Sequence, residues 1–111
     1  MARYLISFDD GAMTFPEGEL AAVAEASHAV VREARDAGVW VFGGGLERQR
    51  ASVVATDGAV ADGPFPETKA VLGGFSIVEV STREDALEWA ARIAAACRCA
   101  QEVREIMSDP A

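Results

Sequence analysis

The chain has 111 residues, half of them hydrophobic and a quarter charged, which suits one folded domain over residues 1–111 and excludes a disordered polymer. Its formal net charge of −8 argues against nucleic-acid binding, because contacts to phosphates require clustered Lys and Arg. No apolar run approaches the roughly 20 residues that a membrane span needs, and no basic and apolar leader opens the sequence. We therefore expect a cytoplasmic protein that contacts neither nucleic acid nor membrane.

The first part of the chain predicts a strand followed by a long amphipathic helix. Residues 3–8 form a short run rich in Tyr, Leu, Ile and Phe, which is typical of a strand. Acidic residues then precede residues 19–37, in which apolar side chains recur at helical spacing along one face. Gly38 is the expected stop of this helix.

A second strand is expected at residues 39–42, and it is apolar on both faces. Strict alternation places Trp40 and Phe42 on one side and the two valines on the other. Three glycines follow at residues 43–45. Because no helix begins after them and no phosphate-loop lysine is present, we interpret them as a bulge or a bend at the strand end and not as an anion-binding loop.

The next segments predict a hairpin and another strand. Residues 52–56 and 59–62 flank an Asp-Gly pair, which is a strong signal of a two-residue hairpin turn. Residues 75–80 form the following strand and are again apolar on both sides. A strand of this kind is expected to be covered on both faces.

The last part of the chain predicts a second helix and a polar strand. We expect Ser81 to cap the helix, because Glu84 stands three residues later and completes a capping box. Apolar residues then recur at helical spacing. Residues 102–107 form the last strand, which we expect at or near a sheet edge.

This order of elements predicts an α+β fold, a ferredoxin-like β-α-β-β-α-β arrangement with an inserted hairpin. Two helices can cover only one face of such a sheet. The strands at residues 39–42 and 75–80 would then expose apolar side chains on the other face. We therefore expect a homodimer in which the sheets of two copies face each other.

The cysteines do not indicate a metal centre. Cys97 and Cys99 are too close in sequence for an ordinary disulfide, and two thiols fall short of the four ligands of a structural zinc site. His28 is the only histidine, and no paired His/Glu spacing accompanies it. We predict reduced thiols near a helix end, with no metal and no other cofactor.

The most informative stretch is residues 62–75, DGPFPETKAVLGGF. It resembles the DGPF signature of the YCII-related (YciI-like) family, and flanking segments extend the resemblance over essentially the whole chain. One departure is Ala70, where the family pattern has a Glu. The resemblance implies a ferredoxin-like subunit that pairs into a dimeric α/β barrel.

The resemblance also implies small-molecule chemistry. At least one relative acts as a dehydrochlorinase on a chlorinated hydroxyhydroquinone, and other relatives have been proposed to use a His–Asp pair in a pocket. Many members with the DGPF motif are encoded near extracytoplasmic-function sigma factors.

The candidate catalytic residues are His28 and Asp62. His28 lies at the border of the apolar stripe of its helix, near the expected seam between helix and sheet, and histidine is the side chain best suited to proton transfer near neutral pH. Asp62 would orient its ring. The candidate ligand-binding residues are the aromatic and charged side chains of the motif and of the second strand: Trp40, Phe42, Phe65, Glu67 and Lys69.

Each of these assignments has a structural alternative. His28 can be a border residue satisfied by a backbone carbonyl, Asp62 can cap the turn, and Glu67 and Lys69 can pair across the loop. Two functions therefore stay open at this point. One is an acid–base enzyme, lyase-like, acting on a small aromatic or organic acid. The other is a ligand-binding or regulatory dimer without catalysis, linked to transcription control by sigma factors.

Overall fold

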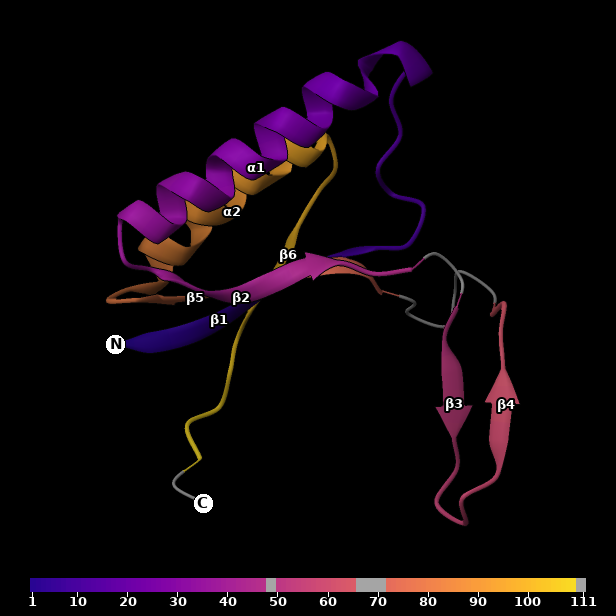
Figure 1. Cartoon of the computed structure of the whole chain (residues 1–111). Helices are drawn as coiled ribbons and strands as arrows, with labels where there is room; N and C mark the ends of the chain where they lie inside the picture. The colour runs from indigo at the N-terminus through magenta and orange to yellow at the C-terminus, as the bar shows by residue number, and fades with distance from the viewer. Residues whose placement is uncertain (48–49, 66–71, 110–111) are drawn as a thin grey trace.

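The computed structural model describes residues 1–47, 50–65 and 72–109, which fold into helices over an antiparallel sheet (Figure 1). The elements in chain order are β1 (Ala2–Asp9), the 3-10 turn η1 (Glu17–Glu19), α1 (Leu20–Asp36), β2 (Trp40–Gly45), β3 (Ser52–Val54), β4 (Val60–Asp62), β5 (Leu72–Val80), α2 (Arg83–Cys97) and β6 (Glu102–Glu105). No helix in the described part of the chain is both long and apolar enough to cross a membrane.

The main sheet has the strand order β2-β5-β1-β6, and β1 pairs antiparallel with both of its neighbours. This order confirms the ferredoxin-like α+β arrangement. The inserted hairpin forms a separate two-stranded sheet, β3-β4. Figure 1 shows both helices on one side of the main sheet, while the hairpin extends from the end of the sheet to the opposite side.

The core lies between the sheet and α2. Alternate side chains of β1 and β5 face the helices, among them Tyr4, Ile6 and Val78, and all three are buried. On α2 the buried contacts come largely from small residues such as Ala86 and Ala90, which let the helix approach the sheet closely. The helix α1 packs mainly against α2 and makes fewer contacts with β2. Space therefore remains between α1 and the sheet on the β2 side.

The other face of the main sheet carries apolar side chains that neither helix of the described residues covers. Phe75 and Ile77 alternate on this face of β5, and Leu5 lies beside them on β1. The ring of Phe42 stands 6.0 Å from that of Phe75 and is 63 % exposed. We call these four residues the open face. That a second copy of the chain covers this open face remains a prediction.

One prediction about side-chain direction was wrong. Strict alternation placed Trp40 and Phe42 on the same side of the second strand. In the structure a register shift falls between them, so that Trp40 pairs with Val78 and Phe42 with Ile77. Since successive residues of β5 point to opposite faces, Trp40 lies on the helix side and Phe42 on the open face.

Helix capping also differs from the expectation. Thr82, not Ser81, is the N-cap of α2, and its hydroxyl accepts a hydrogen bond from the backbone N–H of Asp85 at 3.1 Å. Thr82 is the last residue with extended backbone angles, which is the geometry that lets a side chain reach back to the first turn. The strand β6 is shorter than expected and ends at Glu105.

Candidate functional site

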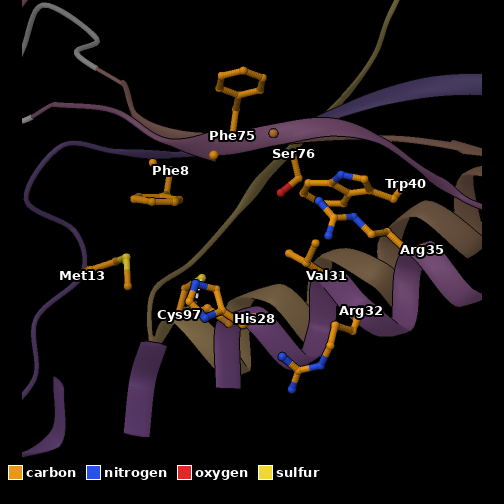
Figure 2. Close-up of a pocket in the computed structure, with 14 residues that line it drawn as sticks. Phe8, Met13, His28, Val31, Arg32, Arg35, Trp40, Phe75, Ser76 and Cys97 are labelled. Carbon is orange, nitrogen blue, oxygen red and sulfur yellow. Dashed lines mark hydrogen bonds between the residues drawn. The ribbon is translucent and has the colours of Figure 1, made fainter. Parts of the chain in front are cut away.

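A pocket of about 600 Å³ opens between α1 and the β2 side of the sheet. Its floor comes from β2, β5 and the end of β1, and its roof from α1 (Figure 2). The last residue of α2 and the segment after β1 close one side with Cys97 and Met13. A hollow of this size suits a small organic molecule.

Glycines make the floor of the pocket. A Cβ atom on Gly43 would stand 2.9 Å from Cη2 of Trp40, and one on Gly74 would stand 2.6 Å from Cζ of Phe8. The absence of side chains at these two positions therefore lets both aromatic rings lie close against the sheet. Figure 2 shows Phe8, Trp40 and Ser76 pointing from the sheet toward the helices, whereas the ring of Phe75 points the other way.

The roof of the pocket is a single face of α1 and carries cationic groups. Ser27, Val31 and Arg35 follow one another at intervals of four residues and therefore share this face. His28 and Arg32 stand beside them on the rim, and both are exposed.

The two arginines differ in their partners. Arg32 is held by Glu25 at 2.7 Å and points outward in Figure 2. Arg35 extends toward the sheet and forms no ion pair with a residue that the structure describes. In a chain of net charge −8 this rim is a local concentration of positive charge. An anionic ligand is therefore favoured there over a cationic one.

A thiol lies at the closed end of the pocket. The Sγ atom of Cys97 is 3.6 Å from Oγ of Ser27, and this contact links α1 to the end of α2. Both cysteines are free in the structure, and Cys97 is the last residue of α2, at the helix end where the sequence placed the thiols. Burial raises the pKa of the Cys99 thiol, and the neighbouring Cys97 raises it further.

Of the predicted site residues, His28 and Trp40 line this pocket. Phe42 lies on the open face instead. Asp62 ends β4 in the hairpin, is exposed, and accepts a hydrogen bond from Oγ of Ser52 at 2.5 Å. The structure therefore does not bring Asp62 and His28 together at this pocket, whose lining includes His28 but not Asp62.

The rest of the DGPF motif is described only in part. Phe65 is half-buried, and its ring lies close to Gly63, 3.1 Å from where a Cβ would stand. The Gly63–Pro64 peptide bond is cis. Glu67 and Lys69 lie outside the described residues, so their predicted role in ligand binding stays a prediction.

The pocket residues that were not predicted from the sequence include Arg35, Ser76 and Phe8. Arg35 stands four residues after Val31 and so shares its helix face. Ser76 is, with Glu79, one of two polar side chains in an otherwise apolar strand. Phe8 continues the alternation of Tyr4 and Ile6 toward the helices. The spacing signal was present for each of them, but it indicates burial as readily as ligand contact.

Comparison with known proteins supports the family resemblance. The model of the YCII-related domain matches residues 3–108. No curated protein has a sequence that matches this chain. Among solved structures, the chain is similar to 5-chloro-2-hydroxyhydroquinone dehydrochlorinase from Burkholderia phenoliruptrix AC1100, in complex with 2,5-dihydroxybenzoquinone. The TM-score is 0.50 at 14% sequence identity, and the match covers 96% of this chain and 95% of that one. At this identity the likeness shows a shared fold.

Proposed function

The chain belongs to the YCII-related family, and from this premise we propose that its pocket binds a small, planar organic anion and transfers a proton to or from it. One observation carries the proposal. His28 and Arg35, which has no ion pair among the described residues, project from the same helix over a floor walled by Phe8 and Trp40. Proton transfer, anion binding and ring stacking thus meet in one hollow.

The ligand class follows from these groups. Flat aromatic walls favour a planar ring, because rings stack or pack edge to face against Phe and Trp. A guanidinium presents several N–H donors in one plane and binds carboxylates or phenolates with paired hydrogen bonds. Arg35 is available for such bonds, since no described acidic residue holds it.

The chemistry that fits is general acid–base catalysis. His28 would take a proton from the ring substituent or ring carbon of the ligand, while a leaving anion departs along the Arg35 side of the rim. The substrate thereby loses one proton and one anion, which is the balance of an elimination. The fold shared with a dehydrochlorinase supports this class of reaction, and the hydroxyl of Ser76 faces the same space.

Binding is tested by calorimetric titration with benzoate and with benzamide, which have nearly the same shape but differ in charge. We expect benzoate to bind more tightly, and Arg35→Met to weaken benzoate by about ten- to a hundredfold, since a hydrogen bond to a charged group is worth about 1.5–3 kcal/mol. The matched control is Arg83→Met on α2, which lies outside the pocket. Equal binding of both compounds, or equal effects of both variants, would contradict the proposed anion site.

Turnover is tested by chloride release from 5-chloro-2-hydroxyhydroquinone, the compound that the structural relative is named for. We expect release by the native protein and a loss of at least a hundredfold in His28→Gln. An unchanged rate in that variant would remove His28 from the reaction.

A second candidate function is ligand binding without catalysis. It is favoured by one observation: His28 forms no hydrogen bond with a carboxylate among the described residues, so nothing in this part of the chain fixes its ring. Benzoate binding combined with no chloride release would support this candidate.

We also propose a homodimer formed through the open face. Leu5, Phe42, Phe75 and Ile77 are apolar side chains on a sheet face that lacks a helical cover. Sheets stack face to face at about 10 Å, which is the distance that such side chains fill.

A further inference from the structure

We infer that the β3–β4 hairpin is an arm that clasps a second copy of this chain. The inference rests on the proposed dimer and extends it, because the open face alone would leave the hairpin without a contact. Figure 1 shows the hairpin leaving the sheet end and extending on the open-face side, away from the helices. It is therefore placed to run past a partner that is seated on the open face.

Within the described part of its own chain, the hairpin packs against no other helix or strand to a substantial extent. Its strands pair with each other. All residues of β3 and β4 are exposed. The extended arm raises the radius of gyration to 15.4 Å, against about 13 Å for a compact domain of this length.

An isolated two-stranded hairpin is at best marginally stable in water, so an ordered one requires cover. The exposed apolar side chains of the hairpin also indicate that its surface is covered. Val54 and Val60 are cross-strand partners, and they are 64 % and 62 % exposed. The adjacent pair, Ser52 and Asp62, forms a hydroxyl–carboxylate hydrogen bond. The two valines can therefore be buried without desolvating a polar side chain, whereas burial of the Asp62 carboxylate would be costly.

The charges on the open side of the sheet permit a second copy of the chain there. The whole chain carries −8, which would repel another copy at most surfaces. On the open side of the sheet, two ion pairs compensate charge locally: Arg3 with Glu79 at 2.8 Å and Arg104 with Glu102 at 3.0 Å. Two identical copies can meet across such a charge-compensated surface, and two-fold symmetry would use each arm once.

The test uses Val54→Lys with Val60→Glu, which removes the apolar pair while the opposite charges keep the strands together. The matched control is Thr56→Lys with Ala59→Glu, which adds the same charges beside the turn. We expect sedimentation equilibrium to give twice the subunit mass of 11.7 kDa for the native protein and the control. The valine variant should have a dimer dissociation constant raised by about a hundredfold or more, because four valines lose cover in each dimer.

A third variant separates this inference from the dimer on which it rests. Phe42→Lys lies on the open face and should weaken the dimer whether or not the arm takes part. If Phe42→Lys dissociates the dimer and the valine variant matches its control, the arm inference is wrong and the dimer stands. If the native protein is monomeric at all concentrations, both are wrong.

Hydrogen exchange gives an independent readout that needs no variant. The backbone amides of β3 and β4 should be protected at high protein concentration and lose that protection on dilution below the dimer dissociation constant. Fast exchange at every concentration, in a protein that is shown to be dimeric, would overturn the inference.

Discussion

Gly43→Ala is the sharpest test of how the pocket is built. Gly43 lies on the helix side of β2 and pairs with Ser76. An added Cβ would stand 2.8 Å from Cα of Ser76 and 2.9 Å from Cη2 of Trp40. The Cα atom of Ser76 belongs to the backbone in the middle of the sheet. The added methyl group can therefore be accommodated only if the strand shifts or the indole of Trp40 rotates out of the pocket.

Overpacking of this kind costs about 1–3 kcal/mol in the free energy of unfolding. For a domain of this size each kcal/mol lowers the melting temperature by roughly 4 °C or more. The matched control is Gly45→Ala, two residues along the same strand and on the same face, where an added Cβ has no atom within 4 Å. A glycine-to-alanine change without strain stabilises by about 0.4–1 kcal/mol, because the unfolded chain loses freedom.

Urea unfolding followed by circular dichroism measures both variants. We expect Gly43→Ala to be destabilised by at least about 1 kcal/mol relative to Gly45→Ala, with a changed Trp fluorescence from the displaced Trp40. Equal stability of the two variants would refute the close packing of Trp40 against the sheet, and with it the shape of the pocket floor.

Two further predictions follow from the thiols and from the single tyrosine. Because Cys97 lines the pocket, bound benzoate should slow its alkylation. Burial raises the pKa of Cys99, so this thiol should react slowly, and benzoate should leave its rate unchanged. Mass spectrometry that shows no protection of Cys97 would contradict the proposed ligand position. The hydroxyl of Tyr4 donates a hydrogen bond to Glu105 at 2.9 Å, and this bond, with burial and the carboxylate charge, raises the pKa of Tyr4. The contribution of protonated Tyr4 to the free energy of unfolding should therefore be complete below the unfolded pKa of about 10 and be lost as the pH rises through the folded pKa. In Glu105→Gln, the phenolate absorbance of Tyr4 should appear at lower pH than in the native chain.

Much of the fold could be predicted because local patterns decide it. Helical spacing identified the face of α1 that carries His28, and the Asp-Gly pair identified the β3–β4 hairpin. The side on which Phe42 lies could not be predicted, because alternation assumes a regular strand. The register shift after Trp40 depends on pairing with β5, which is distant in sequence.

The relation of Asp62 to His28 could not be predicted either. Both residues were chosen for their chemistry and for the local motif that holds them. The direction in which a hairpin leaves a sheet depends on what covers it, and that information is not in the hairpin's own sequence. For Arg35, the position on the helix could be predicted from the sequence. Only the structure shows that this side chain lies above Trp40 and Ser76.

In the proposed function, His28 and Trp40 share one ligand site on the helix side of the sheet. Nuclear magnetic resonance tests it directly, because the chain has one histidine and two tryptophans, and Trp89 on α2 lies outside the pocket beneath the guanidinium of Arg92. Titration with benzoate should shift the ring signals of His28 and the indole N–H of Trp40 together, with the same dissociation constant, and leave Trp89 unchanged. Shifts of Trp89 alone, or of Trp40 without His28, would contradict a shared ligand site.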